Sequence, residues 1–477
     1  MKVLTTLRLT VAALLLAIGP LMAEIKLPAI VSSNMILQRN AKVVLWGWAD
    51  PQERITIQAS WLKGRLRVQA DQDGHWRQEV QTTNSKAPQT IQLKGNNSDI
   101  NLDNILFGEV WLCSGQSNMQ QPVTGYNGQP TFGTIEAVTH GSNPNLRLFT
   151  VKRVGAKTPL EDVKEYTAWQ QASPDNVGEF SAVGYYFGQQ LQQVLDVPVG
   201  IIHTSWGGSI VEAWMSNETL SAYQKIDLTN ADLSKSHGVK TALFNAMINP
   251  LIPFTIKGAL WYQGESNRNQ PEAYKELFPA MVKDWRTRWN NGDFPFYYVQ
   301  IAPFGYKDSQ SAFIREAQLQ CEDLIPNAGM AVAMDLGKEM SIHPPYKKEV
   351  ADRLLYLALN KTYGFSKIDC AGPKYVSSKQ QDGGMVLQFD HAETGLYSTE
   401  GLEGFEIAGA DKVFHPADAK IVGTDKVLVK SIHVASPVAV RYAWENWIIG
   451  SLFDTNMLPA SSFRTDTWEE PVKISQK

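Results

Sequence analysis

The chain has 477 residues, of which 43% are hydrophobic and 19% are charged, and its formal net charge is −4. That length suffices for two or three domains with a sizeable core. The slightly acidic balance argues against nucleic acid or an anionic membrane as the main partner. The three cysteines lack CxxC spacing, and the eight histidines show no HExxH or HxH pairing. We therefore expect neither a disulfide framework, nor a metal site, nor a cofactor.

The first 23 residues have the pattern of a secretory signal peptide. Lys2 and Arg8 precede an apolar stretch at 9–18, and the small residue Ala23 stands at the expected cleavage position. We predict cleavage there and export to the periplasm or the cell exterior. Because Leu21 is large for its position, an uncleaved, membrane-anchored form is the alternative. Cleavage would leave 42 basic and 48 acidic residues.

Residues 24–105 alternate short runs of β-type residues with turns. The expected strands are 43–48, 55–59, 65–69 and 90–93, separated by Asp50-Pro51, Asp73-Gly74 and Asn96-Asn97. This spacing predicts a small β-sandwich domain. It contains no cluster of titratable residues, so we expect a spacer or a module that contacts carbohydrate.

Residues 106–368 alternate short apolar strands with longer amphipathic helices. The expected strands are 109–113, 199–203, 257–262, 296–302 and 330–334, and the expected helices are 181–195, 272–289 and one that begins near Pro345. This alternation predicts the α/β class, a three-layer fold in which helices cover both faces of a parallel sheet. Such sheets place their sites beyond the carboxyl ends of the strands. Residues 369–477 return to β-type runs and predict a β-rich C-terminal region.

Polar residues follow the first two of these strands. Strand 109–113 runs into Ser117 at the start of a helix, where amide donors and the helix dipole stabilise charge that develops at a neighbouring carbonyl. Strand 199–203 runs into Gly207 and Gly208, whose amides can approach a ligand as an oxyanion hole requires. Each pattern alone has an ordinary alternative, a helix cap or a turn.

The next strand ends in Gln263, whose side-chain amide is a candidate donor to an oxyanion. Strand 330–334 leads to Asp335 and then to His343, which precedes two prolines that stiffen the loop. A lone loop histidine is more often structural, but this one lies at the sheet edge where Ser117 also stands. Four loops with fitting chemistry at one edge predict hydrolysis through a serine nucleophile.

Four segments carry a family resemblance: 115–119 (GQSNM), 206–209 (WGGS), 261–267 (WYQGESN) and 342–344 (IHP). They resemble the sequence blocks of the sialate O-acetylesterase family, which belongs to the SGNH, or GDSL-like, hydrolase superfamily. The resemblance extends over nearly all of the chain after residue 23 and includes segments 108–112, 244–248, 441–444, 458–460 and 462–466. An α/β-hydrolase lipase is disfavoured because the serine motif is not GxSxG.

The resemblance implies a carbohydrate O-acetylesterase that works through an acetyl-enzyme. Ser117 would attack the ester carbonyl and His343 would act as its base. The amide of Ser117, the amide of Gly208 (or Gly207) and the side chain of Gln263 would hold the oxyanion. The expected substrate contacts are Gln116, Asn118, Trp206, Trp261, Glu265 and Asn267. For each tryptophan, packing in the core is the alternative.

One position departs from the superfamily pattern. An aspartate often stands two or three residues before the histidine, where this chain has Ser341 and Met340. Asp335 is the first candidate for the orienting acid because it ends the preceding strand, with Glu339 and Glu265 behind it. A backbone carbonyl in place of an acid is the remaining alternative.

The expected substrate is an O-acetylated sugar or glycan. Sialic acid is the favoured sugar, and acetylated xylan or another glycan is the competitor. The missing acid keeps a different class open, a catalytically inactive carbohydrate-binding protein. The oligomeric state has no signature in the sequence.

Overall fold

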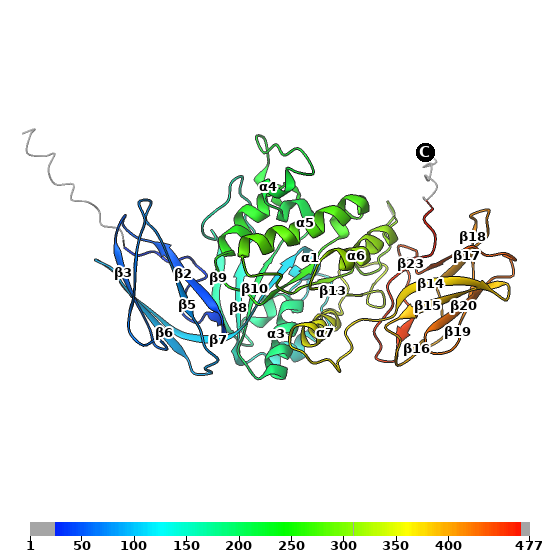
Figure 1. The fold of residues 1–477 in the computed structure, drawn as a ribbon, viewed down its shortest axis with the longest axis horizontal. Helices are drawn as coiled ribbons and strands as arrows, with labels where there is room; N and C mark the ends of the chain where they lie inside the picture. Colours follow the sequence, from blue (N-terminus) through cyan, green and yellow to red (C-terminus); the bar gives the residue numbers. More distant parts are fainter. Residues whose placement is uncertain (1–23, 309, 469–477) are drawn as a thin grey trace, which may run out of the picture.

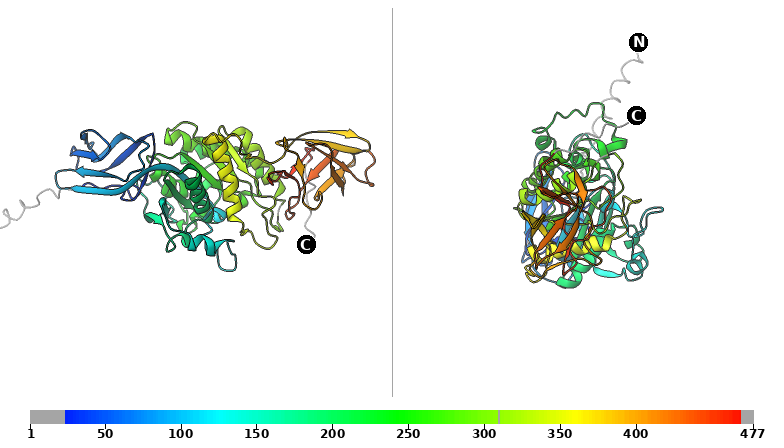
Figure 2. Two further views of the ribbon diagram at one scale, coloured as in Figure 1. Left: turned by 90° about the horizontal axis from the view of Figure 1, so that it is seen from below. Right: turned by 90° about the vertical axis from the view of Figure 1, so that its right-hand side faces the viewer.

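The computed structural model of the chain describes residues 24–308 and 310–468. An N-terminal β-domain, a central α/β domain and a C-terminal β-region follow one another along an elongated molecule (Figures 1 and 2). The predicted signal peptide, residues 1–23, lies outside the described residues. Within the described ranges, no helix has the length and apolar character needed to span a bilayer.

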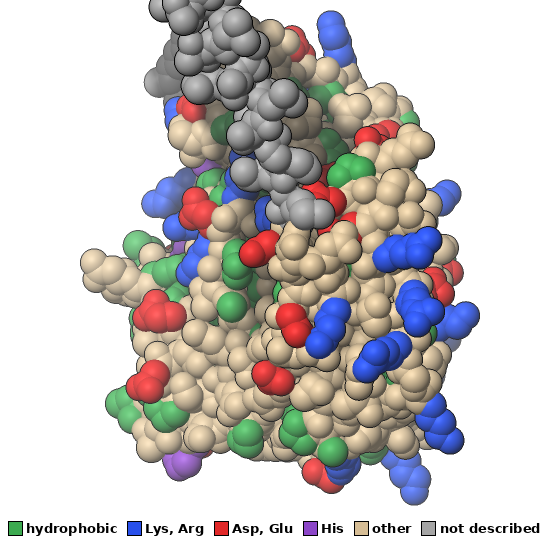
Figure 3. Space-filling model, turned by 90° about the vertical axis from the view of Figure 1, so that its left-hand side faces the viewer, with side chains coloured by type: hydrophobic (Ala, Val, Ile, Leu, Met, Phe, Trp, Pro, Cys, Tyr) green, Lys and Arg blue, Asp and Glu red, His purple; other side chains and the backbone are tan. Residues whose placement is uncertain are grey.

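The N-terminal domain contains two antiparallel sheets around one core and a short strand, Ile36–Gln38, that pairs parallel with residues 106–108. Its strands are β1 (Ile36–Gln38), β2 (Lys42–Trp48), β3 (Arg54–Ala59), β4 (Leu66–Gln69), β5 (His75–Gln81) and β6 (Gln89–Lys94). Strand β2 pairs with β5, and β3 pairs with β4 and β6. The predicted sandwich-like arrangement of β-strands in the N-terminal domain is confirmed. On the end face of this domain, basic side chains gather along one side, acidic ones are spread over the rest, and hydrophobic ones form only small groups (Figure 3).

A single long strand, β7 (Asp99–Gly115), joins the first two parts. Its first half pairs antiparallel with β6, and its second half pairs parallel with β10 and β11 of the central sheet. The sequence predicted a strand only over 109–113, because the preceding residues alternate polar and apolar side chains as in a separate, half-buried strand. The expected division between residues 105 and 106 therefore falls within a strand.

The central sheet has the strand order β13-β12-β11-β7-β10-β8-β9. The strands besides β7 are β8 (Asn143–Val151), β9 (Tyr166–Ala172), β10 (Val199–Ser205), β11 (Gly258–Tyr262), β12 (Phe296–Val299) and β13 (Ala328–Ala331). All neighbours are parallel except β8 and β9, which pair antiparallel. The predicted parallel sheet is confirmed, with one antiparallel edge strand that was not predicted.

Helices cover both faces of this sheet and make three layers. The long helices are α3 (Ala182–Leu195) and α7 (Lys347–Leu357) on one face, with α5 (Pro271–Trp289) and α6 (Ala312–Leu324) on the other (Figure 1). Strand β7 shows the division, since Trp111 packs in the core with α3 and α7 whereas Val110 packs in the core with α5. The three-layer expectation is confirmed.

Several short helices lie in the loops. The α-helical ones are α1 (Ser117–Gln120), α2 (Thr134–Thr139) and α4 (Asn217–Leu220); the 3-10 turns are Val177–Glu179, Val211–Trp214, Leu233–Gly238, Asn249–Leu251 and Glu265–Asn267; the π turns are Phe244–Ile248 and Ala358–Thr362. Most of them follow the carboxyl ends of the sheet strands, where the site is expected.

The C-terminal region is β-rich, as predicted. Its strands are β14 (Lys374–Gln381), β15 (Gly384–Asp390), β16 (Leu396–Tyr397), β17 (Phe405–Ala408), β18 (Phe414–Pro416), β19 (Asp418–Ile421), β20 (Lys426–Lys430), β21 (Ala439–Tyr442), β22 (Phe453–Asp454) and β23 (Phe463–Arg464). They form the antiparallel sheets β14-β15-β20-β19 and β18-β17-β21-β23 and the pair β16-β22. Met334 of the central domain lies in their core.

Candidate active site

Ser117 is the first residue of α1, directly after the central strand β7. The turn before it depends on Gly115, whose φ is +133° and whose Cβ, if present, would lie 2.2 Å from the carbonyl oxygen of Tyr262. The amide of Gln116 donates to that same oxygen at 2.9 Å. The Ser117 side chain is half-buried, and no described residue hydrogen-bonds to its hydroxyl. The serine therefore stands at a fixed turn with an uncommitted hydroxyl.

His343 is half-buried in the loop before α7 and contacts the loop that follows Ser117. Its Nδ1 lies 2.5 Å from Oε1 of Gln129. Its ring meets the ring of Tyr126 edge-on, with centroids 5.2 Å apart, and the Tyr126 hydroxyl donates to the carbonyl oxygen of Ser117 at 3.1 Å. Because an amide oxygen only accepts, Nδ1 carries the proton and Nε2 is the free acceptor. No hydrogen bond between His343 and the Ser117 hydroxyl is formed in this structure, a common state of unliganded catalytic pairs.

The electrostatic surroundings keep His343 neutral. Burial, and secondly the nearby Lys347, lower the pKa of His343 to about 4. A histidine must be neutral to accept a proton from serine, so the imidazole is in the form that a general base requires at neutral pH.

Asn118 links α1, the helix that begins at Ser117, to the loop of His343. Its Nδ2 donates to Oε1 of Glu265 at 2.5 Å and to the carbonyl oxygen of Ile342 at 3.1 Å. Its Oδ1 accepts from Nζ of Lys347 at 2.6 Å. Burial raises the pKa of Glu265 and lowers the pKa of Lys347 to about 7. Asn118 and Glu265, expected to contact substrate, thus lie beneath the site and fix the residue that precedes His343.

The glycine pair after β10 lies against Ser117. A Cβ on Gly207 would be 3.2 Å from Cβ of Ser117. The Gly207 amide donates to Oε1 of Gln120 at 2.7 Å, whereas the amides of Gly208 and Ser117 have no acceptor within the described part of the chain. Of the two glycines, Gly208 is therefore the one that can donate to an oxyanion.

Gln263 does not offer the donor that the sequence suggested. It is fully buried, and its Nε2 donates to the carbonyl oxygen of Ser209 at 3.0 Å and to Oδ1 of Asn267 at 2.7 Å, which uses both of its hydrogens. Asn267 in turn accepts from the amide of Val211 at 2.9 Å and donates to Glu212 at 3.0 Å. Through these bonds both residues hold the β10 and β11 loops together, while Oε1 of Gln263 is buried and has no hydrogen-bond partner among the described residues.

Gln116 has the amide donor that Gln263 lacks. Its Oε1 accepts from the amides of Gly264 and Ser266, each at 3.3 Å. Its Nε2 has no acceptor among the residues that the structure describes. This donor belongs to the residue directly before Ser117, which makes it a candidate contact for a group bound at the serine.

The two tryptophans expected at the site have different environments. Trp206 is half-buried and packs against His237, with ring centroids 6.2 Å apart. Trp261 has 0% exposure and packs in the apolar core, with its ring centroid 5.9 Å from that of Trp214. The expectation that Trp261 contacts a sugar is therefore corrected. Strand β11 is buried on both faces, and the Trp261 side chain packs in the core. His237, which the sequence did not single out, adjoins the glycine pair, since a Cβ on Gly208 would be 3.4 Å from its ring.

The structure does not bring Asp335 to His343. Both carboxylate oxygens of Asp335 accept from Arg353 on α7, at 2.7 and 2.6 Å. Glu339 is exposed, and Glu265 contacts Asn118. The group on Nδ1 is Gln129, which sequence reasoning missed because a glutamine in a loop carries no motif.

Within residues 24–308 and 310–468, no group of three or more His, Cys, Asp or Glu side chains is arranged to hold a metal ion. Cys113, Cys321 and Cys370 are all free thiols.

A serine after the central strand of a three-layer α/β sheet, a neutral histidine from another loop and unused amides beside them place the chain in the class of SGNH-type ester hydrolases. Comparisons with known proteins give the family. The family described as "Carbohydrate esterase, sialic acid-specific acetylesterase" matches residues 107–351. The chain is 31% identical to human sialate O-acetylesterase over 87% of each chain, and 27% identical to the mouse enzyme over 91% of this chain and 93% of that one.

A solved structure agrees with this assignment. A carbohydrate acetylesterase from Xanthomonas citri has a TM-score of 0.85 and 34% identity, and the match covers 93% of this chain and 100% of that one. The chain belongs to the sialic acid-specific acetylesterase family and is a carboxylic-ester hydrolase.

Proposed function

We propose that the protein is an exported carbohydrate O-acetylesterase that removes acetyl groups from sugar hydroxyls, with O-acetylated sialic acid as its favoured substrate. The sugar class rests on the similarity to human sialate O-acetylesterase over most of both chains. Export rests on the signal-like pattern of residues 1–23. The main support for the mechanism is one loop that hydrogen-bonds to both residues. Its Tyr126 donates to the carbonyl of Ser117, and its Gln129 accepts from the ring of His343.

The reaction begins with attack of the Ser117 hydroxyl oxygen on the acetyl carbonyl carbon, while Nε2 of His343 takes the hydroxyl proton. The carbonyl oxygen becomes an oxyanion. The uncommitted donors on residues near Ser117, namely the amides of Ser117 and Gly208 and Nε2 of Gln116, would stabilise it. When the tetrahedral intermediate collapses, the bond to the sugar oxygen breaks, and His343 gives its proton to that oxygen.

The second half-reaction repeats these steps with water. His343 takes a proton from water, the resulting hydroxide attacks the acetyl carbon on Ser117, and acetate leaves as Ser117 regains its proton. Throughout, the oxygen of Gln129 accepts from Nδ1 of His343 and fixes the tautomer. The proposed mechanism is therefore a Ser–His dyad, in which the neutral side-chain amide of Gln129 takes the place of the carboxylate of a catalytic triad.

The buried network beneath the site fixes the distance between nucleophile and base. Asn118 adjoins Ser117 in the chain and holds the carbonyl of Ile342, which adjoins His343. The other hydrogen of the Asn118 amide is donated to Glu265, and its oxygen accepts from Lys347. Because small displacements of reacting groups cost large factors in rate, this clamp is a positioning device.

A glycan other than sialic acid is the competing substrate. The Xanthomonas citri structure, which resembles this chain over nearly its full length, is described as a carbohydrate acetylesterase without a named sugar. It favours a broader carbohydrate specificity.

The test is turnover of an aryl acetate and of a panel of acetylated sugars by the wild type, Ser117→Ala and His343→Ala. The panel contains free and glycosidically linked O-acetyl sialic acids and acetylated xylan. We expect at least one sugar ester to be hydrolysed and both variants to lose about 10³-fold or more in kcat with folding intact. Turnover by Ser117→Ala within about tenfold of wild type would exclude the serine mechanism. Hydrolysis of aryl acetate alone would exclude the carbohydrate substrate.

A further inference from the structure

A cleft of about 680 Å³ lies between the loop that follows β13 and the C-terminal region. The loop contributes Ser341 and Met340 to its wall, and the C-terminal region contributes Trp447 and Ile449. Ser341 also donates through its hydroxyl to the carbonyl oxygen of His343 at 3.0 Å. The cleft therefore begins beside the residue proposed as the general base.

The lining suits the apolar face of a sugar ring. Met340 is 90% exposed and Ile449 is 41% exposed, and Tyr346 and Trp447 present half-buried rings to the same cleft. Large apolar side chains exposed together in a concave surface usually mark a binding site. A pyranose has apolar C–H faces that stack on aromatic rings and hydroxyls that bond to polar neighbours.

The polar lining favours a neutral ligand. Lys338 places its ammonium 5.1 Å from the centre of the Tyr346 ring, and Glu339 of the same loop is exposed. Lys338 offers a donor for hydroxyls, and Glu339, which has no ion-pair partner within the described part of the chain, offers an acceptor, so neither sign of charge is in excess. The other acid on the wall, Asp335, is already paired with Arg353.

The C-terminal wall is anchored to the central domain by hydrogen bonds. Buried Arg315 on α6 donates to the carbonyl oxygens of Ala443 and Glu445, at 3.0 and 2.7 Å. Asn446 accepts from the amide of Ser311 at 2.6 Å. The amide of Gly450 donates to the carbonyl oxygen of Met334 at 3.0 Å. These bonds flank Trp447 on both sides in the chain.

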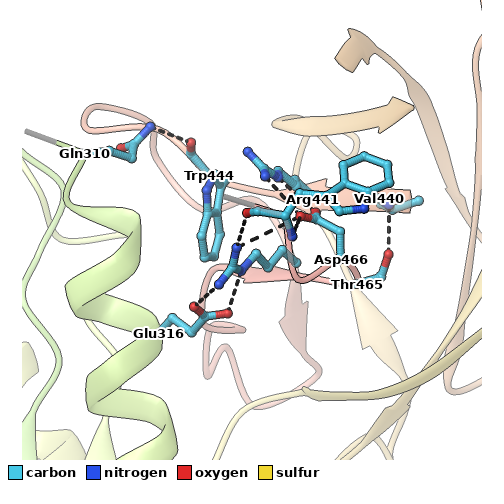
Figure 4. A network of polar contacts seen from close by, with 9 residues as sticks. Gln310, Glu316, Val440, Arg441, Trp444, Thr465 and Asp466 are labelled. Atoms are coloured by element: carbon cyan, nitrogen blue, oxygen red, sulfur yellow. Dashed lines mark hydrogen bonds and ion pairs between the residues drawn. The ribbon is translucent and has the colours of Figure 1, made fainter. Parts of the chain in front are cut away.

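Neighbouring contacts reinforce the same junction (Figure 4). Gln310 donates to the carbonyl oxygen of Trp444 at 3.0 Å, and Glu316 on α6 pairs with Arg464 at 2.8 Å. Arg441, within the C-terminal region, pairs with Asp466 at 3.0 Å. Trp447 therefore belongs to the β-region but is held in place beside the catalytic loop.

We propose that this cleft is a sugar-binding subsite that holds a neutral sugar residue next to the acetylated one. This inference rests on the proposed esterase function and deepens it, because it makes the substrate a glycan chain rather than a free monosaccharide. It also assigns a role to the C-terminal region, which supplies the aromatic wall.

The experiment measures kcat/KM for matched short and long esters: O-acetylated xylose against O-acetylated xylotetraose, and free O-acetyl N-acetylneuraminic acid against the same ester in sialyllactose. The variants are Trp447→Ala and, from the opposite wall, Met340→Ser. Tyr397→Ala is the matched control, because Tyr397 is 42% exposed on β16 of the same region and does not line the cleft. Aryl acetate turnover and thermal melting report the catalytic centre and the fold.

We expect the wild type to prefer the longer ester in at least one pair, and both cleft variants to lower the long-to-short ratio by about three- to tenfold, mainly through KM. Tyr397→Ala should leave the ratio at the wild-type value. Equal kcat/KM for long and short esters, or a loss that is the same for aryl acetate, monosaccharide and chain, would overturn the subsite while the esterase function stands. Hydrolysis of no sugar ester at all would instead reject the proposed function.

Discussion

Replacing Gln129 by leucine removes the acceptor that lies 2.5 Å from Nδ1 of His343 and leaves the ring free to rotate or to change tautomer. In the transition state the imidazole becomes an imidazolium, and a hydrogen bond to a charged group contributes about 1.5–3 kcal/mol. The expected fall in kcat/KM is therefore about 10- to 100-fold. It is smaller than the roughly 10⁴-fold loss that follows removal of a triad carboxylate, because an amide does not neutralise the imidazolium.

The assay is the pH profile of kcat/KM with an aryl acetate for the wild type, Gln129→Leu, Gln129→Glu and Asp335→Asn. Gln129→Glu places a carboxylate on Nδ1, so it should raise the pKa of His343 and shift the acid limb of the profile upward. Asp335→Asn should keep kcat/KM within about threefold of wild type and lower the melting temperature, because it breaks the pair with Arg353. Wild-type activity of Gln129→Leu, together with a loss of about 100-fold or more in Asp335→Asn, would show that Asp335 and not Gln129 supports His343.

Three further results are expected. The kcat/KM profile should fall toward low pH around pH 4, because His343, with its pKa lowered to about 4, is protonated and unable to accept a proton below that value; a limb near the unperturbed value, about 6.5, would contradict this. Asn118→Ala should lower kcat by about 10- to 100-fold with little change in KM, since it releases the clamp on Ile342; circular dichroism and melting check that the variant folds, and a change confined to KM would indicate substrate contact instead. Prolonged dialysis against a chelator should leave activity unchanged, because the proposed donors to the oxyanion are amides; restoration of lost activity by one divalent metal would contradict that mechanism.

The positions of Ser117, the glycine pair and the His343 loop at one sheet edge could be predicted from the sequence because each lies in a loop that follows a buried strand. Parallel strands end at one edge of a sheet, so Ser117, Gly208 and the loop of His343 converge there. Trp261 could not be placed in the same way. All five residues of β11 are buried, so its sequence has no alternation to show which side chains face the core.

Gln129, the partner of His343 Nδ1, could not be predicted from the sequence for a different reason. Asp335 was favoured because it lies only eight residues before His343 in the chain. In the structure its carboxylate forms an ion pair with Arg353 on α7 instead. Gln129 reaches His343 across 214 positions from a loop that has no periodicity. That loop is held by Gln121, whose buried amide donates to the Gln129 carbonyl at 3.3 Å, a tertiary contact that local pattern does not encode.

The central claim, that Ser117 carries the acetyl group, is tested most directly by trapping the acetyl-enzyme. Wild-type enzyme and His343→Ala are mixed with an aryl acetate, quenched in acid within the first turnovers and digested, and the peptides are mapped by mass spectrometry. We expect an acetyl group on the peptide that contains Ser117, localised to that residue and missing from Ser117→Ala. It should persist longest in His343→Ala, which lacks the histidine that activates water. An acetyl group on another residue, or hydrolysis by Ser117→Ala at the wild-type rate, would contradict the central claim.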